Sequence, residues 1–505
     1  MFGSVRKCVN SCFVNTYIVL RNAKLHTRPD FTKNNFNVTR GYYNTLEENH
    51  IQFFYQLLGE QRVIVNVSDL ERYNVDWFRH LRGNSSIVLR PKTTEEVSHI
   101  LSFCNQNRLA VCPQGGNTSM VGASVPIFDE IVINTDLMNE IISLDDTSGV
   151  LVCQAGCILE NLNNYVNKKD LMIPLDLGAK GSCHIGGNVS TNAGGLRLLR
   201  YGNLHGNVLG LEVVKADGEI LDCLNTLKKD NTGYHLKHLF IGSEGTLGFV
   251  TKVAIQCPPK PKSINLAFLG LQTYEKVLKA YKLAKHSLGE ILSAVEVMDT
   301  PTMQLVNEHL HLPSPIGDYP FYLIIETSGS NEKHDLEKLN TFLDLSLVKH
   351  FVLNGTVTSE PSKCQAIWNI RERIPEAFHK DGYVFLYDVT LPLQNYYTLV
   401  KEIREYMGNK AHRVFGFGHL GDGNLHLQIT VKKYSPEIKS FIEPYIFEKV
   451  IEMNGSISAE HGIGFLKAKY LHLAKSNAAI NLMQDLKDVL DPKGILNPYK
   501  VLPRE

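Results

Sequence analysis

The sequence lacks the features that mark several common classes of protein. None of its ten cysteines forms a C-x-x-C pair, and no apolar run approaches the roughly 18 residues of a membrane-spanning helix. Net charge is also absent, because 52 basic residues balance 52 acidic ones among the 505. Nucleic-acid binding as the main activity is therefore not supported, and we expect the cysteines to be reduced, mostly buried thiols of a non-secreted protein.

Familiar nucleotide-binding motifs are missing as well. The glycine-rich segments match neither G-x-G-x-x-G nor the Walker pattern, so the Rossmann and P-loop folds lose their main support. We find no internal repeat and no low-complexity tract. What remains is an ordinary globular composition, 43% apolar and 21% charged, in a chain long enough for two or three domains.

The first forty residues differ from the rest of the chain. They contain seven basic side chains and one acid, Asp30, with hydroxylated residues and asparagines between them. This composition resembles a mitochondrial presequence, which we place at residues 1–44 and exclude from the fold. A merely basic tail is the alternative.

Two glycine-rich segments in the first half favour a site for a ligand. A predicted helix at residues 94–107, begun by Thr93 or Thr94, leads through a short strand into the turn at residues 113–119. Such a turn can offer several backbone N–H groups to a phosphate. Residues 174–195 are almost all small, so they cannot form a core but allow a ligand to approach the backbone closely. Loops that bind nothing are the alternative for both.

The remaining pattern predicts a change of architecture near residue 260. Residues 208–221 predict a hairpin, and the proline-rich segment 258–261 indicates a domain boundary. Strands then alternate with helices, which suggests an α+β sheet layer with helices on one face. Near the end we predict helices at residues 436–453 and 478–490, followed by a turn-rich tail.

The strongest chemical signal is a pair of histidines around a glycine-rich turn. His419 and His426 lie between two short apolar segments, which predicts strand, turn and strand. On one continuous strand an offset of seven would point the rings in opposite directions, whereas a glycine turn can bring them together. Further along the chain, Glu460 and His461 stand side by side. We expect His419, His426 and Glu460 to hold a divalent metal, with His461 free to move protons, and ordinary structural histidines are the alternative.

Several segments together resemble the flavin-binding fold of the vanillyl-alcohol oxidase family: residues 113–119, 174–195, 242–248 and 497–498. The histidine segments and the tail resemble its D-2-hydroxyacid dehydrogenase branch. Within that branch, the hydroxyglutarate-oxidising members are the most similar at residues 76–79, 174–206, 229–234 and 321–330. The resemblance covers residues 45–503.

The resemblance implies an α+β fold. A PCMH-type FAD-binding domain of two subdomains is expected at residues 45–260, a substrate-binding cap at 261–432, and a helical segment that completes the metal and flavin site at 433–505. FAD is expected to be noncovalent, because residues 113–119 contain no histidine or cysteine to attach it. The residues expected at the cofactor are Pro113, Gln114, Gly115, Gly116, Asn117, Thr118, Ser119, Pro174, Gly178, Ala179, Ser182, Gly186, Gly187, Asn188, Thr191, Asn192, Gly194, Glu244 and Asn497.

The resemblance also implies a reaction. Zinc held by His419, His426 and Glu460 would bind the hydroxyl of a D-2-hydroxy acid, His461 would take its proton, and flavin N5 would accept the hydride, with 2-oxoglutarate as the product from D-2-hydroxyglutarate. Arg371 would bind a substrate carboxylate, although a helix-surface charge is the alternative for this residue. An electron-transfer flavoprotein is the expected acceptor, and the mitochondrial matrix the expected location.

Three substrate-site positions depart from the hydroxyglutarate-oxidising pattern. Pro375, Leu386 and Gln428 stand where threonine, lysine and asparagine are expected. At Leu386 the loss of a charged hydrogen bond is worth about 1.5–3 kcal/mol, so we expect weaker or altered recognition of the second carboxylate. A D-lactate-type dehydrogenase therefore stays an alternative. Alternatives from other functional classes are a flavin-fold alkyl transferase, a zinc hydrolase and a noncatalytic binding protein.

Overall fold

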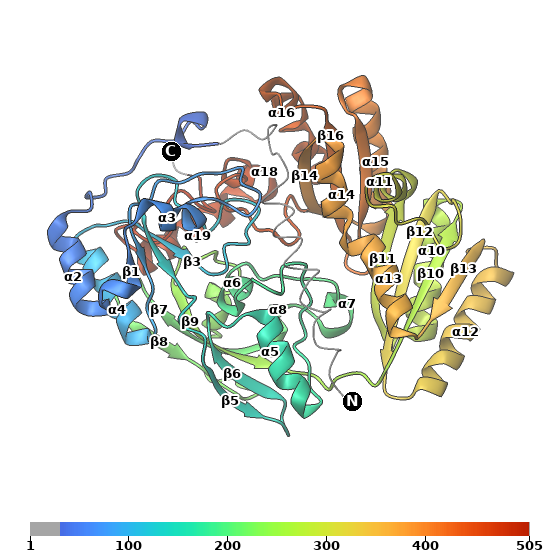
Figure 1. The fold of residues 1–505 in the computed structure, drawn as a ribbon, viewed down its shortest axis with the longest axis horizontal. Coiled ribbons are helices and arrows are strands. Elements are labelled where there is room, and N and C mark those ends of the chain that lie inside the picture. Colours follow the sequence, from blue (N-terminus) through green and yellow to red (C-terminus); the bar gives the residue numbers. More distant parts are fainter. Residues whose placement is uncertain (1–30, 504–505) are drawn as a thin grey trace, which may run out of the picture.

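The protein divides into a flavin-type domain of two subdomains and a separate cap (Figure 1), in a computed structural model that describes residues 31–503. Residues 1–30 of the predicted presequence lie outside the described residues. Residues 31–44 pack on the first domain, where Phe31 donates its N–H to the carbonyl of His80 at 2.8 Å and Arg40 pairs with Asp129 at 2.7 Å. These residues are therefore part of the fold.

The first subdomain has a four-stranded sheet in the order β1-β2-β4-β3, with parallel pairing among β2, β4 and β3. The strands are β1 (Val63–Ile64), β2 (Val88–Leu89), β3 (Val111–Gln114) and β4 (Ile131–Asn134). Helices α2 (Glu48–Leu58), α3 (Val67–Asn74) and α4 (Thr94–Gln106) accompany them. The predicted helix after Thr93 is confirmed, since the Thr93 side chain caps it by accepting the N–H of Glu96.

The second subdomain is built on a five-stranded antiparallel sheet in the order β5-β6-β9-β7-β8. Its strands are β5 (Ile141–Asp145), β6 (Val150–Gln154), β7 (Val208–Val214), β8 (Ile220–Cys223) and β9 (Phe249–Gln256). Its helices are α5 (Leu159–Val166), α6 (Ile185–Ser190), α7 (Leu198–Tyr201), α8 (Leu204–Asn207) and α9 (Lys237–Phe240). The predicted hairpin is β7 and β8.

The cap contains a seven-stranded sheet in the order β13-β10-β12-β11-β15-β16-β14, antiparallel throughout. Its strands are β10 (Ser263–Leu271), β11 (Leu292–Asp299), β12 (Phe321–Gly329), β13 (Asn354–Thr358), β14 (Tyr383–Thr390), β15 (Arg413–His419) and β16 (Asn424–Val431). Its helices are α10 (Tyr274–Leu288), α11 (Thr300–Leu310), α12 (Glu332–Val348), α13 (Pro361–Glu372), α14 (Ile374–Asp381) and α15 (Leu393–Met407).

Helices cover both faces of the cap sheet, so the prediction of helices on one face is wrong. One apolar core joins alternate strand residues to α10, α12 and α15, and a second joins the intervening residues to α11, α13 and α14. Strands that are apolar on both faces accommodate two such layers, because successive side chains point to opposite sides. The second face, which carries Phe415 and Phe417, is the one that matters for function.

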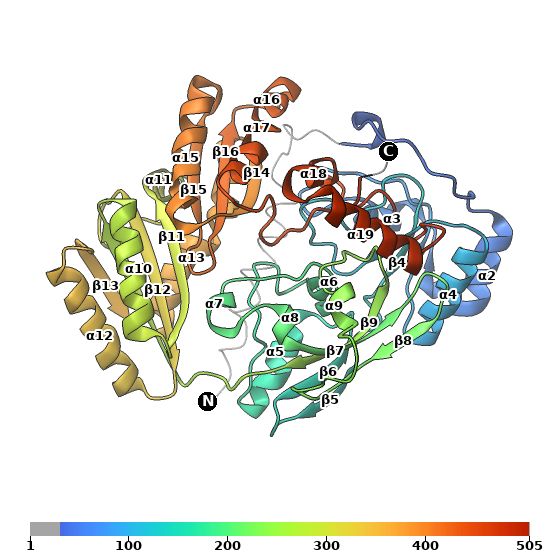
Figure 2. The ribbon, with the colours of Figure 1, turned by 180° about the vertical axis from the view of Figure 1, so that it is seen from behind.

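The C-terminal segment leaves the cap and packs against the first domain. It contains α16 (Pro436–Ile442), α17 (Tyr445–Glu452), α18 (Leu471–Ala474) and α19 (Asn477–Leu490). Figure 2 shows α19 against the first subdomain, and Leu496 forms a parallel bridge with Val111 there. The single helix predicted at residues 436–453 is two helices, because Pro444 has no N–H and holds Glu443 in extended backbone. Among residues 31–503, none of the helices has the length and apolarity that a membrane crossing needs.

Candidate functional site

His419 and His426 share one face of the cap sheet because of hairpin register. Phe417 lies opposite His426 and His419 lies opposite Asn424, so the two histidines are diagonal neighbours with ring centroids 5.2 Å apart. Gly418 and Gly423 have φ values of +150° and +79°, which glycine adopts without strain. The prediction that the glycine turn brings both rings together is confirmed.

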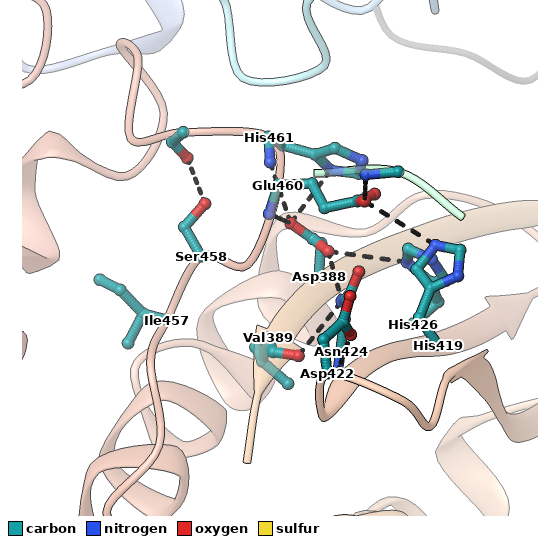
Figure 3. A network of polar contacts seen from close by, with 12 residues as sticks. Asp388, Val389, His419, Asp422, Asn424, His426, Ile457, Ser458, Glu460 and His461 are labelled. Carbon is teal, nitrogen blue, oxygen red and sulfur yellow. Dashed lines mark hydrogen bonds and ion pairs between the residues drawn. The ribbon is translucent and has the colours of Figure 1, made fainter. Parts of the chain in front are cut away.

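Glu460 joins the two histidines from a distant loop. Donor atoms of His419, His426 and Glu460 all lie within 4.8 Å of one another, and Nε2 of His419 is 3.8 Å from Oε1 of Glu460 (Figure 3). Two imidazoles and one carboxylate are a zinc-type donor set that leaves a coordination position open for another ligand. The donor set therefore fits a divalent metal.

Asp388 organises this cluster, although the sequence did not single it out. It lies directly opposite His426 on β14, is 2% exposed, and its Oδ1 is 3.6 Å from Nδ1 of His426. Its Oδ2 accepts the backbone N–H groups of Glu460 at 2.8 Å and His461 at 3.1 Å (Figure 3). Although burial acts to raise it, the neighbouring His461, His426 and Lys467 hold the pKa of Asp388 far below its usual value. The acid thereby ties the Glu460 loop to the strand of His426.

Glu296 is the corresponding acid for His419. It lies directly opposite His419 on β11 and is fully buried. Its Oε1 is 2.6 Å from Nδ1 of His419, and its Oε2 accepts a hydrogen bond from Nε of Arg371 at 2.7 Å. Although burial acts to lower it, the carboxylates of Glu296 and Glu460 raise the pKa of His419 to about 9. The surroundings of His419 therefore favour positive charge, as they would around a metal ion.

His461 lies beside the cluster and outside the group formed by His419, His426 and Glu460. Its Nδ1 is 3.7 Å from Oδ2 of Asp388, and its ring centroid is 6.4 Å from that of His426. The side chain is 23% exposed, more than those of the other two histidines. An imidazole in this place can exchange a proton with a ligand and then with solvent.

The predicted substrate residues gather along the same face. Arg371 of α13 is buried, with its guanidinium carbon 4.7 Å from the ring centroid of Phe417. Leu386 and Gln428 are cross-strand partners on β14 and β16, while Pro375 lies in the first turn of α14, which packs against both strands. Oε1 of Gln428 is buried without a hydrogen-bond partner within the described part of the chain. These positions therefore lie on the side of the sheet that carries the histidines.

The two predicted glycine-rich segments meet in the structure. A Cβ on Gly116 would lie 2.0 Å from the carbonyl oxygen of Ser182, and one on Gly115 would lie 3.3 Å from the Cβ of His184. Only glycine permits so close a contact between the segments. The structure therefore brings residues 113–119 and 174–195 together.

The joined segments leave space and unsatisfied polar atoms. A Cβ on Gly178 or Gly187 would have nothing within 4 Å, and neither residue has a positive φ, so protein packing does not require glycine there. Oδ1 atoms of Asn188 and Asn192 are buried with no hydrogen-bond partner among residues 31–503. Open backbone beside unpaired acceptors fits a large polar cofactor such as FAD.

Other predicted cofactor residues use their side chains within the protein. Asn117 donates to the carbonyls of Arg72 and Val75, and Gln114 donates to those of Tyr73 and Ser124. Ser119 accepts the N–H groups of residues 121 and 123. These contacts shape the turn that the backbone presents. We call residues 113–119 and 174–195 together the glycine-rich cradle. The other predicted cofactor residues within it are Pro113, Thr118, Pro174, Ala179, Gly186, Thr191 and Gly194.

Glu244 and Asn497 hold the C-terminal segment against this cradle. The buried carboxylate of Glu244 accepts the N–H groups of Ile463 and Gly464, and burial raises its pKa. Asn497 donates to the carbonyls of Ala123 and Glu244 at 2.9 and 2.7 Å. Both side chains are therefore positioned to fix loops around the cradle.

One contact links the cradle to the group of His419, His426 and Glu460, which we call the metal-type cluster. Backbone N–H of Gly195 donates to Oε1 of Glu460 at 2.6 Å, and a Cβ on Gly194 would lie 3.4 Å from the same oxygen. The end of the glycine-rich segment thus touches the carboxylate of the cluster. A cofactor in the cradle and a ligand at the cluster would be neighbours.

Comparison with known proteins gives both halves of the chain close counterparts. A family model described as an FAD binding domain matches residues 85–224, and one described as the C-terminal domain of FAD linked oxidases matches residues 260–501. A rat protein named D-2-hydroxyglutarate dehydrogenase, mitochondrial, is 54% identical over 472 residues, covering 94% of this chain and 88% of its own. An Arabidopsis thaliana protein of the same name is 52% identical, covering 91% and 83%.

Among solved structures, alkyldihydroxyacetonephosphate synthase has the same fold. It superposes with a TM-score of 0.71 at 18% identity, covering 96% of this chain and 92% of its own. At that identity the likeness concerns the fold alone. It agrees with the expected α+β architecture of a PCMH-type flavin domain joined to a cap.

Proposed function

Because the chain belongs to the family of FAD-dependent, mitochondrial D-2-hydroxyglutarate dehydrogenases, we propose that it oxidises D-2-hydroxyglutarate to 2-oxoglutarate in the mitochondrion. The observation that carries this proposal is the contact between Gly195 and Glu460, which joins the flavin-type cradle to the metal-type cluster. Oxidation of a 2-hydroxy acid requires removal of a hydride and a proton from neighbouring atoms, and this junction is where both groups would be received.

Noncovalent FAD would be held by the two glycine-rich segments. Gly178, Gly187 and the unpaired Oδ1 atoms of Asn188 and Asn192 support this assignment, as does the absence of histidine and cysteine from residues 113–119. When bound, FAD supplies the hydride acceptor at its N5 atom. The protein residues supply close backbone approach and hydrogen-bond partners, since few bulky side chains occupy the cradle.

His419, His426 and Glu460 would hold zinc. When bound, the metal lowers the pKa of a substrate hydroxyl and fixes its orientation. Nδ1 of His419 faces Glu296 at 2.6 Å, which leaves its Nε2 as the ligand, and Nδ1 of His426 lies 3.6 Å from Asp388, so Nε2 of His426 would be the ligand in the same way. A similar outer acid behind each histidine is usual for metal sites in proteins.

His461 would take the hydroxyl proton. Asp388 accepts the backbone N–H of His461 and lies 3.7 Å from its Nδ1, so it fixes the position of the residue and stabilises the imidazolium that forms. The partial exposure of His461 then lets the proton pass to solvent. This assignment gives the base and the metal ligand Glu460 adjacent places on one loop.

Arg371 would bind the carboxylate next to the reacting carbon. Its Nε donates to Glu296, and this leaves the two terminal nitrogens of the guanidinium to bind a substrate carboxylate in a bidentate way. Pro375, Leu386 and Gln428 would line the far end of the substrate. An electron-transfer flavoprotein would accept the electrons, and the matrix would be the location.

Alternatives of other classes explain less of the molecule. An alkyl transferase would use the cradle but has no evident use for two histidines and a carboxylate backed by two buried acids. A zinc hydrolase would use the cluster but gives the cradle no role. A D-lactate-type dehydrogenase would use both, and the apolar Leu386 keeps it as the alternative within the same class.

The visible spectrum of the purified protein tests the proposal. A flavin band that bleaches on anaerobic addition of D-2-hydroxyglutarate, and not of the L isomer, is the expected result. A preparation that binds no added FAD would overturn the proposal. So would a flavoprotein that no D-2-hydroxy acid reduces.

A further inference from the structure

Glu296 connects two groups that have different tasks in the proposed reaction. One oxygen faces Nδ1 of His419 at 2.6 Å, and the other accepts Nε of Arg371 at 2.7 Å. The carboxylate is fully buried, and its backbone position lies directly opposite His419 in the sheet. Both oxygens are therefore committed, one to each group.

The charges around Glu296 make this arrangement stable. The guanidinium of Arg371 lies against one oxygen of Glu296 at 2.7 Å and offsets the charge of the buried carboxylate. Removing a partner from a buried charged contact is costly, because the remaining charge has no water to solvate it. The imidazole, the carboxylate and the guanidinium thus hold one another in place.

The geometry also selects what each neighbour presents to the pocket. With Nδ1–H donating to Glu296, His419 keeps the lone pair of Nε2 for a metal. With Nε engaged, Arg371 has its two terminal nitrogens left for a planar carboxylate. Within the described residues, Nε is the one side-chain atom of Arg371 that donates a hydrogen bond to the protein.

A 2-hydroxy acid carries its carboxylate and hydroxyl on adjacent carbons, so the two binding groups must keep a constant separation. We infer that Glu296 is a positioning residue that sets the carboxylate-binding Arg371 at a fixed distance from the metal ligand His419. This inference rests on the proposed function. Positioning errors of about 1 Å cost roughly a hundredfold in rate, which is why one rigid connection matters.

Glu296→Gln tests the connection while keeping the size of the side chain. An amide accepts through one oxygen only, so it cannot receive both N–H groups. An amide nitrogen facing Nδ1 of His419 forces the imidazole proton onto Nε2 and removes the lone pair a metal needs. We expect zinc affinity, measured by competition with a chromogenic chelator, to fall about 10- to 100-fold.

The Arg371 side is measured separately, at zinc concentrations that saturate each variant. There Glu296→Gln should still lower kcat/KM for D-2-hydroxyglutarate at least about tenfold, because Arg371 has lost its fixed position. Glu296→Asp keeps the negative charge but shortens the side chain by one methylene, so the carboxylate lies farther from His419 and Arg371. It should lower both zinc affinity and kcat/KM, each by less than Glu296→Gln does. It replaces Glu296→Gln as the test if the amide variant does not fold.

Glu326 provides a matched control. It is a buried acid on β12, on the same face of the sheet, where it accepts hydrogen bonds from Trp368 at 3.2 Å and Ser293 at 2.8 Å. Glu326→Gln should change zinc affinity by less than about threefold, since within residues 31–503 the polar contacts of Glu326 are with Ser293, Ser328, Trp368 and Arg197, and none of these belongs to the metal-type cluster.

Two results would overturn the inference. One is zinc affinity in a folded Glu296 variant within about threefold of the unsubstituted protein. The other is an unchanged kcat/KM at saturating zinc. Failure of the proposed function is distinguishable, because it appears as no oxidation of any D-2-hydroxy acid by the unsubstituted protein, whereas the zinc titration still reports on Glu296.

Discussion

Leu386 and Gln428 lie directly opposite one another on β14 and β16. Leu386 lies two residues before Asp388 on its strand, and Gln428 lies two residues after His426. Two residues along a strand span about 7 Å, so the pair lies within reach of the far end of a short hydroxy acid bound at His426. Leu386 is packed with the apolar core of that face, and Oε1 of Gln428 has no partner among the described residues. This pair of residues therefore offers an amide and an apolar side chain to that end of the substrate.

Leu386→Lys should increase the preference for D-2-hydroxyglutarate over D-lactate. A charged hydrogen bond to the second carboxylate is worth about 1.5–3 kcal/mol, or roughly one to two orders of magnitude in the ratio of kcat/KM values. Leu386→Met, which adds no charge, should leave the ratio within about threefold. A strong preference for the diacid in the unsubstituted protein, unchanged by the lysine, would contradict this account of the pocket.

Removal of metal should abolish oxidation and leave the flavin in place. A chelator is expected to strip the cluster, and added zinc to restore activity, because three protein ligands bind one ion reversibly. Metal analysis of His419→Ala should show the loss directly. His309→Ala is the control, since His309 belongs to a separate group with Glu308 and Asp381 at the other end of the cap. Full activity after complete removal of metal would contradict the assignment.

Gly187→Val should reduce flavin content at least about tenfold while leaving the fold intact. A Cβ at this position would have no atom within 4 Å apart from its chain neighbours and the backbone of its own helix, so the valine side chain would project into the space assigned to FAD. Gly206→Val is the matched control and should keep its flavin, because a Cβ at Gly206 also has nothing within 4 Å but this residue lies in α8, outside the cradle. Flavin absorbance per protein after gel filtration is the measurement. Equal flavin content in both variants would move the cofactor away from α6.

Asp381→Asn should lower the thermal unfolding midpoint near neutral pH. Burial acts to raise the pKa of Asp381, but hydrogen bonds from Thr430 and His309 and the charges of Arg413 and His412 lower it overall. A carboxyl with a lowered folded-state pKa stabilises the protein above its unfolded pKa of about 4, and this stability is lost as the pH falls through the folded value. The free energy of unfolding of the variant should be about 1.5–3 kcal/mol below that of the unsubstituted protein near pH 7. This difference, and with it the difference in midpoint, should shrink below pH 4.

The control for this prediction is Asp344→Asn at an exposed acid of α12. Its midpoint should follow that of the unsubstituted protein at every pH, because an exposed acid contributes little. A gap for Asp381→Asn that stays constant from pH 7 to below pH 4 would contradict the proposed ionic role.

Local features were predictable from the sequence because their causes are local. The capping of α4 by Thr93, the histidine turn and the small-residue segments follow from backbone preferences of a few neighbouring residues. The helix at residues 436–453 was predicted too long because its apolar pattern continues across Pro444. The covering of the cap sheet by helices on both faces was missed because a strand apolar on both sides does not reveal what packs on each.

By itself, the sequence determined which side chains could do the chemistry: His419, His426, Glu460 and His461 are recognisable from their types and their glycine-rich surroundings. Only the tertiary structure decided how they are held. Glu296 and Asp388 become the partners of the two histidines because β11 pairs with β15 and β14 with β16, across separations of 123 and 38 positions in the chain. A slip of one residue in either pairing would turn every side chain to the opposite face, and no local pattern specifies that register.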